Sequence, residues 1–463
     1  MLKAALHNLG CKVNAYETES MQQQLEERGY EIVPFDEKAD VYIVNTCSVT
    51  NIADRKSRQM LHRAKKLNPE AVVVAAGCYV QVSADAAKED DAVDVIVGNN
   101  KKGQLADILD SYLKENKRGG TELHLVDIAQ EKEYESLGLR QMSEHTRAFI
   151  KVQDGCNQFC SYCIIPYTRG RVRSRPSEDV VQEVEGLVSR GYKEVVVNGI
   201  HLSSYGMEHK GEGAVQGGDW DHGPLLDLIK KIHGIDGLER IRLGSLEPRI
   251  ITEAFADELA ALPKFCPHFH LSLQSGCDET LKRMNRHYTT EDYLRRCGIL
   301  RSSFRDPAIT TDVIVGFPGE TEEEFEKTRA FLEQVHFYEM HVFKYSKREG
   351  TKAAAMPNQV PDSVKGERSD RLLRLEAEMS KEYRRRFTGR EVSVLFEEKV
   401  EMEGKPYMIG FTPQYVKAAL ELDASDSGQE PAGQIYKMKA GEMLQGQLLR
   451  VEYAKREEIP DQG

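Results

Sequence analysis

The chain has 463 residues, which is enough for two to four domains. Hydrophobic residues make up 40% of it and charged residues 30%, as in ordinary globular proteins, and no apolar run approaches the roughly 18–20 residues that span a bilayer. A formal net charge of −12 argues against a protein that coats nucleic acid indiscriminately. Local basic patches can still bind phosphates, because salt confines their field to about 10 Å. We therefore expect no membrane partner.

Cysteine usage indicates a reducing compartment. The chain has nine cysteines, an odd number, and its first residues lack the pattern of a signal peptide. Disulfide frameworks belong to oxidising compartments. We expect a cytoplasmic protein with reduced thiols.

The first hundred residues repeat a short apolar run that stops at a cysteine, namely Cys11, Cys47 or Cys78. Amphipathic segments of helical length, at 17–28 and 52–66, separate the runs. This alternation predicts a flavodoxin-like parallel sheet in a domain covering residues 1–115. The carboxyl ends of parallel strands share one edge, so the three thiols should converge into a candidate metal site. Alternatively, each is a small buried residue at a strand end.

A second group of thiols, Cys156, Cys160 and Cys163, has the spacing C-x3-C-x2-C. A closed zinc or iron–sulfur site normally takes four protein ligands. Three close thiolates can instead hold a 4Fe-4S cluster and leave one iron open to a substrate or cofactor. The alternatives are a zinc knuckle with a distant fourth ligand and a run of buried thiols. The remaining cysteines, Cys266, Cys277 and Cys297, are interpreted as ordinary thiols.

A second series of strands and helices begins at Phe149. Its six strand–helix units predict a partial (β/α)6 barrel within residues 142–372, with chemistry at the carboxyl ends of the strands. We expect strands at 194–198, 240–244, 269–273, 309–315 and 339–343. Polar residues or glycines follow several of them, and one tyrosine lies between two cysteines. The candidate cofactor-binding residues are Tyr162, Asn198, Glu247, Ser272, Gln274 and Gly316. A tight turn, or a core position for Tyr162, is the alternative for each.

The C-terminal residues 388–455 contain short alternating runs, at 392–396 and 447–453, which predict a small antiparallel β-barrel. Such barrels often bind oligonucleotides, although fold alone does not give function.

Two basic segments are candidates for RNA binding. Arg169, Arg171, Arg173 and Arg175 recur at every second position, so an extended chain would place them on one face, where they could follow a phosphate backbone. Salt bridges to carboxylates are the alternative. Lys381, Arg384 and Arg385 share one face of an expected helix, for which a solvated surface is the alternative.

Together, the two cysteine groups, the partial barrel and the small C-terminal barrel resemble the radical S-adenosylmethionine methylthiotransferases over nearly the whole chain. The segment 410–417 is similar to the TRAM domain of that family. Residues 9–17 and 201–206 resemble the branch that acts on N6-threonylcarbamoyladenosine in tRNA. After Cys11 this chain has Lys12-Val13, where the isopentenyladenosine branch usually has Gln-Met and the ribosomal-protein branch Pro-Lys.

The resemblance implies specific cofactors and a specific reaction. Cys11, Cys47 and Cys78 would hold an auxiliary 4Fe-4S cluster, and the second trio would hold the 4Fe-4S cluster that cleaves S-adenosylmethionine. Of two S-adenosylmethionine molecules per turnover, one would methylate the inserted sulfur and one would supply the radical that opens carbon 2 of adenine. The product would be 2-methylthio-N6-threonylcarbamoyladenosine at position 37 of tRNA, with no catalytic residue beyond the cluster ligands.

The resemblance also implies partners and leaves alternatives. The partners would be the tRNA anticodon loop, an electron donor such as flavodoxin or ferredoxin, and a sulfur source. The same chemistry on isopentenyladenosine or on a ribosomal protein aspartate is one alternative. A noncatalytic, zinc-containing RNA-binding protein is another.

Overall fold

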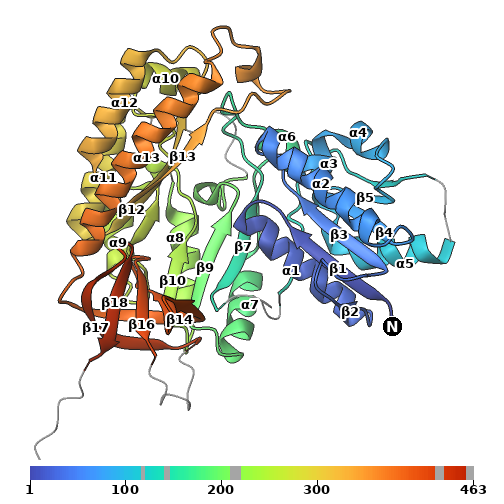
Figure 1. Cartoon of the computed structure of the whole chain (residues 1–463), viewed down its shortest axis with the longest axis horizontal. Coiled ribbons are helices and arrows are strands. Elements are labelled where there is room, and N and C mark those ends of the chain that lie inside the picture. The colour runs from blue at the N-terminus through green and yellow to red at the C-terminus, as the bar shows by residue number, and fades with distance from the viewer. Residues whose placement is uncertain (116–119, 140–145, 209–220, 423–431, 455–463) are drawn as a thin grey trace, which may run out of the picture.

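The computed structural model describes residues 1–115, 120–139, 146–208, 221–422 and 432–454. Figure 1 shows an N-terminal α/β domain (blue) beside a central barrel (green to orange), with a small β-barrel (red) at one end of the latter. The predicted domain limits at residues 142 and 455 lie outside the described residues. Within the described ranges, no helix is both long and apolar enough to cross a membrane.

The N-terminal domain is a six-stranded parallel sheet with the order β2-β1-β3-β4-β5-β6. This is the flavodoxin-like order, as predicted. Central strands are buried on both faces, which explains why they read as continuous apolar runs. The sheet extends beyond the predicted limit at residue 115, because β6 pairs with β5. Its elements are β1 (Lys3–Asn8), α1 (Lys12–Glu27), β2 (Glu31–Ile32), β3 (Val41–Thr46), α2 (Asn51–Leu67), β4 (Val72–Gly77), α3 (Cys78–Val82), α4 (Ala84–Lys88), β5 (Val95–Val97), η1 (Lys102–Gln104), α5 (Leu105–Glu115) and β6 (Glu122–His124).

The central domain has six parallel strands, and this confirms the partial barrel. The strands are β7 (Ala148–Asp154), β9 (Glu194–Gly199), β10 (Arg240–Leu243), β11 (His268–His270), β12 (Ala308–Val315) and β13 (Glu339–Lys344), with β8 (Arg173–Ser174) antiparallel to the end of β7. The connecting elements are α6 (Ile165–Arg169), α7 (Ser177–Ser189), η2 (Leu202–Ser204), α8 (Gly223–His233), η3 (Pro248–Ile250), α9 (Glu253–Ala260), α10 (Asp278–Arg283), α11 (Thr290–Ser303), α12 (Glu322–Val335) and η4 (Lys352–Ala355). β11 is shorter than predicted, because only isolated bridges continue its pairing beyond His270.

Alternation along the strands separates an outer from an inner face. In β11 to β13 the outward residues, such as Phe269, Val313 and Met340, pack into the core shared with the surrounding helices. The residues between them, including His270 and Asp312, point to the inner face, where part of their surface stays accessible. Polar side chains therefore line the concave side of the barrel.

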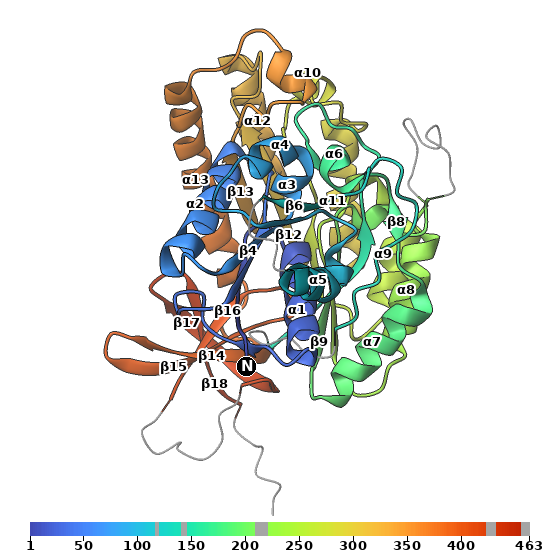
Figure 2. The ribbon, with the colours of Figure 1, turned by 90° about the vertical axis from the view of Figure 1, so that its right-hand side faces the viewer.

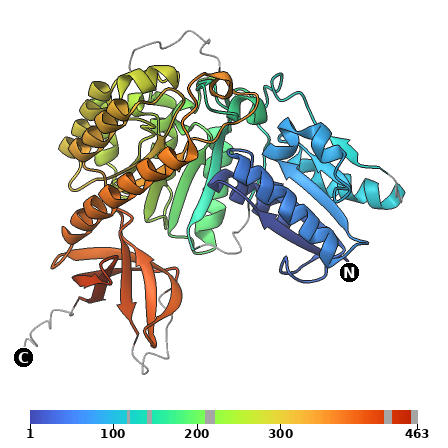
Figure 3. The same cartoon turned by 45° about the horizontal axis from the view of Figure 1, so that its top comes forward.

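The chain leaves the central domain through one long helix, α13 (Asp362–Arg385), which runs down to the small barrel in Figure 3. This helix passes without interruption through residue 372, the predicted limit of the central domain. The small barrel is closed, in the order β14-β15-β16-β18-β17, and only the β16–β18 pair is parallel. Its strands are β14 (Glu391–Met402), β15 (Lys405–Phe411), β16 (Lys417–Glu421), β17 (Ile435–Leu444) and β18 (Leu448–Tyr453). Its assignment as a TRAM domain stays a prediction.

Two arginines of β10 fix the small barrel to the base of the central one. Arg240 donates to the carbonyl oxygens of Phe411 and Ser393, each at 2.9 Å. Arg242 donates to the carbonyl oxygen of Pro413 at 2.8 Å. In Figure 2 the small barrel accordingly lies directly against the lower end of the central domain.

Candidate functional site

The structure places Cys11, Cys47 and Cys78 at the carboxyl ends of β1, β3 and β4, which are neighbouring strands. Gly10 precedes the first of them with φ of +108°, and a Cβ there would lie 2.9 Å from the Cβ of Cys47. Gly77 precedes the third with φ of +94° and equally little space. Only glycine fits these two positions, and it allows the neighbouring loops to approach closely. The three thiols therefore gather at one edge of the sheet.

Cys156, Cys160 and Cys163 lie in the loop between β7 and α6, beyond the carboxyl end of a barrel strand. The turn after α10 holds this loop in place. Ser161 N–H donates to the carbonyl oxygen of Met284 at 3.0 Å, and the loop also accepts hydrogen bonds from the side chain of Asn285. The thiols are thus presented on a loop with fixed ends.

Sulfur spacing tests whether the two trios suit a cluster. Among the described residues, the one group of three histidine, cysteine or carboxylate side chains whose ligand atoms all lie within 4.8 Å is His270, Asp312 and His341. Neither cysteine trio is that close. A single zinc ion with Zn–S bonds of about 2.3 Å would hold its sulfurs about 3.8 Å apart. The sulfurs of each trio therefore stand too far apart in this structure for one zinc ion to bind all three.

Burial keeps thiols of both trios protonated in the absence of a metal. Burial raises the pKa of Cys47 to about 11 and that of Cys156 to about 12. Such thiols stay protonated at neutral pH unless a metal replaces the proton.

Arg286, which the sequence reasoning missed, contacts the second trio. Its Nη1 lies 3.3 Å from Sγ of Cys160, while Nη2 donates to the carbonyl oxygen of Ser272 and Nε to the hydroxyl of Tyr288. No local sequence pattern predicts this contact, because Arg286 is brought close to Cys160 by the turn that also holds the cysteine loop.

The six candidate cofactor residues lie at the predicted strand ends or in the cysteine loop. The Glu247 carboxylate accepts hydrogen bonds from the backbone and Nε of Arg249, at 2.9 and 2.8 Å. Asn198 is buried, and its side chain donates a hydrogen bond to a carbonyl oxygen of its own strand. Gln274 has φ of +74°, which is unusual for a residue with a side chain.

The other candidate cofactor residues also have contacts within the barrel. Ser272 is partly buried, and its carbonyl oxygen accepts a hydrogen bond from Arg286. Tyr162 packs edge-to-face on Phe317, and Gly316 packs under α13 against Lys365. Their role toward a cofactor stays a prediction.

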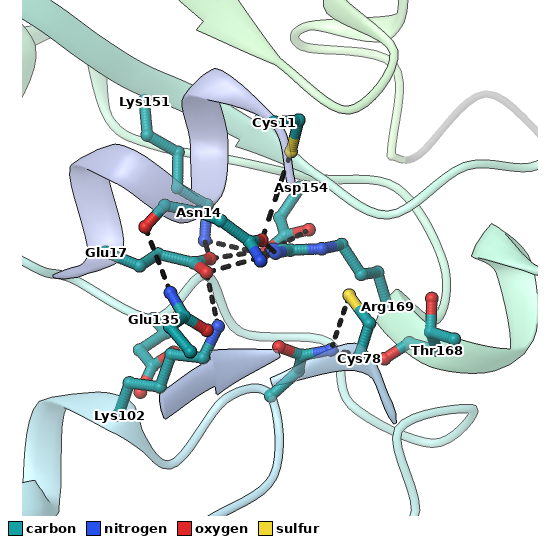
Figure 4. Close-up of polar contacts among 12 residues, drawn as sticks. Cys11, Asn14, Glu17, Cys78, Lys102, Glu135, Lys151, Asp154, Thr168 and Arg169 are labelled. Atoms are coloured by element: carbon teal, nitrogen blue, oxygen red, sulfur yellow. Dashed lines mark hydrogen bonds and ion pairs between the residues drawn. The ribbon is translucent and has the colours of Figure 1, made fainter. Parts of the chain in front are cut away.

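A buried ion network joins the N-terminal domain to the barrel (Figure 4). Arg169 Nη1, from α6, lies 2.7 Å from the Glu17 carboxylate of α1 and 3.2 Å from that of Asp154, and Nη2 donates to Oδ1 of Asn14 at 2.6 Å. Lys151 also pairs with Glu17, at 2.7 Å, and Lys102 with the same carboxylate. Burial alone would raise the pKa of Glu17, but Arg169, Lys102 and Lys151 outweigh it and hold that pKa well below its ordinary value.

The prediction that four alternate arginines bind phosphates is therefore corrected for three of them. Arg169, Arg173 and Arg175 are buried, and their guanidinium groups face carboxylates: Arg175 lies 2.5 Å from Glu183. The salt-bridge alternative holds for these three. Arg171 is partly exposed and stacks on the ring of Phe159 at 4.7 Å.

The second basic segment, on α13, is more exposed to solvent than the first. Lys381 and Arg385 are exposed on the last turns of α13. Arg384 is half-buried and donates to Oγ of Ser380 at 2.6 Å. Two of the three predicted RNA-binding residues are thus accessible beside the small barrel.

Comparison with known proteins decides the family. Residues 3–98 match the family described as uncharacterized protein family UPF0004, and residues 150–332 match the radical SAM superfamily. A Bacillus subtilis (strain 168) protein named threonylcarbamoyladenosine tRNA methylthiotransferase MtaB is 39% identical, with 97% of each chain covered. A Caldicellulosiruptor saccharolyticus protein named tRNA-2-methylthio-N(6)-dimethylallyladenosine synthase is 37% identical over 84% of this chain and 80% of its own. The chain belongs to the radical S-adenosylmethionine methylthiotransferase family. Enzymes of this family use S-adenosylmethionine and 4Fe-4S clusters.

A solved structure supports the fold of this methylthiotransferase. The radical S-adenosylmethionine methyltransferase TsrM from Kitasatospora setae aligns with a TM-score of 0.53 at 15% identity, covering 74% of this chain and 72% of its own. At that identity the likeness concerns the fold alone.

Proposed function

We propose that this methylthiotransferase converts N6-threonylcarbamoyladenosine to 2-methylthio-N6-threonylcarbamoyladenosine at position 37 of tRNA. The observation that carries the acceptor is the near-complete match to the Bacillus subtilis protein, which covers 97% of both chains. A similar match to an Aquifex aeolicus (strain VF5) protein of the same name, at 39% identity, supports it. Base 37 lies in the anticodon loop, where an enzyme can take it out of the stack.

Each part of the chain has a task in this proposal. Cys156, Cys160 and Cys163 would hold the cluster that supplies reductive cleavage of S-adenosylmethionine, and Cys11, Cys47 and Cys78 the auxiliary cluster that supplies sulfur chemistry. The strand-end residues orient the cofactor and exclude water. The Arg169–Glu17 network keeps the two cysteine trios at a fixed separation, because it is buried between the domains that carry them.

RNA would reach this site along the small barrel. Lys381 and Arg385 extend from α13 beside that barrel, and ammonium and guanidinium groups in this setting bind phosphates. Two S-adenosylmethionine molecules would be consumed per turnover. We infer a cytoplasmic location, with a flavodoxin- or ferredoxin-like electron donor and a separate sulfur source as partners, because nine cysteines without a disulfide framework suit a reducing compartment.

Nucleoside mass spectrometry of tRNA tests the acceptor. A deletion strain should lose 2-methylthio-N6-threonylcarbamoyladenosine, accumulate its unmodified precursor and regain the product with the wild-type gene. A gene carrying Cys160→Ala should not restore it. Loss of the dimethylallyl product instead would assign the chain to the other named branch, at 37% identity.

A further inference from the structure

Lys12, at the boundary between the two domains, is a cation without a carboxylate partner among the described residues. It directly follows Cys11, and its Nζ lies 5.8 Å from the ring centre of Phe149 in β7. Its side chain is exposed to solvent. Within the described part of the chain, this ammonium forms no hydrogen bond or ion pair. It therefore lies beside β7 of the barrel without a neutralising carboxylate among the described residues.

The charges around Lys12 add to its positive potential. The surroundings of the ammonium lower the pKa of Lys12 to about 8, first through desolvation and then through repulsion by Arg147 and Arg242, while Glu194 attracts it. That carboxylate already lies 2.8 Å from Nε of Arg242, and Arg147 lies 2.6 Å from Glu397. Because arginines bind both of these carboxylates, the ammonium has no carboxylate of its own in the described part of the chain. An unpaired cation in such a place suits an anionic ligand.

The start of α1 strengthens this preference. Lys12 is the first residue of the helix, and the first turn contains no acidic residue and receives no side-chain cap. The N-terminus of a helix carries a partial positive charge, which favours an anion nearby. The helix N-terminus and the ammonium of Lys12 therefore both favour an anion at this place.

The proposed acceptor carries an anion at the matching place. Threonylcarbamoyladenosine has a threonyl carboxylate, whereas the dimethylallyl group is uncharged. Its ureido N–H can donate to N1 of the same base, which turns the carboxylate toward the edge that holds carbon 2. A residue that binds this carboxylate must then lie next to the groups that deliver sulfur to carbon 2. Lys12 satisfies this condition, since it adjoins Cys11.

We propose that Lys12 binds the threonyl carboxylate of the acceptor nucleoside and thereby selects threonylcarbamoyladenosine over dimethylallyladenosine. This inference rests on the function proposed above. A charged hydrogen bond of this kind should contribute a factor of about 10–100 in affinity. The other use of such a lysine, a contact to an RNA phosphate, would strengthen the binding of every acceptor equally.

The test compares three anticodon stem-loop RNAs that differ only at N6 of base 37: threonylcarbamoyl, its neutral threonine amide, and dimethylallyl. Binding to the cluster-reconstituted protein is measured by fluorescence anisotropy, and product formation by mass spectrometry. The wild type should bind the carboxylate RNA about 10–100 times more tightly than the amide RNA. Lys12→Met should lose this difference, Lys12→Arg should keep most of it, and the distant surface variant Lys66→Met should keep all of it.

Three outcomes would overturn the proposal. The first is equal binding of the carboxylate and amide RNAs by the wild type, a result that needs no variant. The second is full retention of the preference for the carboxylate by Lys12→Met. The third is a loss of affinity in Lys12→Met by the same factor for all three RNAs, as expected for a phosphate contact. Failure of the proposed function looks different, because the wild type would then methylthiolate the dimethylallyl RNA and leave the threonylcarbamoyl RNA unchanged. Iron content is measured for each variant, so that a lost cluster is not read as a lost contact.

Discussion

Arg169 and Glu17 belong to different domains, and their charged groups meet at 2.7 Å in a fully buried position. The same carboxylate also receives Lys151 and Lys102, so one helix of the N-terminal domain is bound by three cations. This contact lies beside the edge where Cys11 and Cys78 are found (Figure 4). It couples the placement of the auxiliary cysteines to the barrel.

Removing this contact should loosen the two domains. Arg169→Met leaves the carboxylates of Glu17 and Asp154 with fewer partners in a buried place, so the free energy of unfolding should fall by about 3–5 kcal/mol. Urea titration followed by circular dichroism measures it. Arg171→Met, two residues away and partly exposed, should cost less than about 1 kcal/mol. Equal losses in both variants would contradict the structural role of Arg169.

Arg286 should tune the cluster of the second trio. Its guanidinium lies 3.3 Å from Sγ of Cys160, and a positive hydrogen-bond donor at a ligand sulfur favours the reduced, more negative cluster. Arg286→Gln should therefore lower the reduction potential measured by electron paramagnetic resonance titration. Iron content should remain unchanged, and Arg286→Lys should restore part of the potential. An unaltered potential in Arg286→Gln would refute this role.

The two cysteine trios should bind iron independently. Reconstituted wild-type protein should hold roughly eight irons, and replacement of either trio by alanine should leave roughly four. Cys297→Ala is the control, because that thiol is buried in the barrel core among apolar residues. Metal analysis that finds zinc in place of iron would rule out the enzyme.

His201 should make stability depend on pH. Burial, with smaller contributions from Arg286 and Arg249, lowers the pKa of His201 to about 3. Since an unfolded histidine has a pKa of about 6.5, protonation favours the unfolded chain, and about 1.4 kcal/mol should be lost per pH unit below 6.5. This stability is fully present above pH 6.5 and declines toward pH 3. Anaerobic denaturant titrations from pH 7.5 to 5.5 should show the slope, and His201→Asn should flatten it.

Lys381 and Arg385 should contribute to tRNA affinity through phosphates. Replacing both with alanine should weaken binding at low salt and reduce the slope of log affinity against log salt by roughly one per lost contact. Lys88→Ala, on the N-terminal domain, should leave the slope unchanged. A double variant with the wild-type slope would exclude α13 from the RNA interface.

The hydrophobic pattern of the sequence predicted the strands and helices, because burial determines both. The strand runs that stop at Cys11, Cys47 and Cys78, and the six strand–helix units, lie where periodicity indicated, because burial on both sheet faces leaves a readable trace. The sequence pattern did not show which individual charged side chains are buried. A spacing of two residues is the same for an exposed arginine row as for Arg169, Arg173 and Arg175, whose carboxylate partners come mostly from other elements.

The same limit applies to Arg286 and Lys12. The position of Arg286 beside Cys160 depends on a turn more than a hundred residues later in the chain. Lys12 was visible as a departure from related motifs, but its lack of a partner emerges only when two domains meet. Sequence reasoning therefore located the thiols and missed the charges that surround them.

The hydrogen bonds from Arg240 and Arg242 to carbonyl oxygens of the small barrel have one more consequence. Because backbone carbonyls of the small barrel accept these hydrogen bonds, they set its position against the central domain. In the proposed complex with RNA, the distance from this barrel to the edge with Cys11, Cys47 and Cys78 would determine which nucleotide of the hairpin loop reaches that edge. Lengthening the stem should then shift which base is reached, without any change in the chemistry.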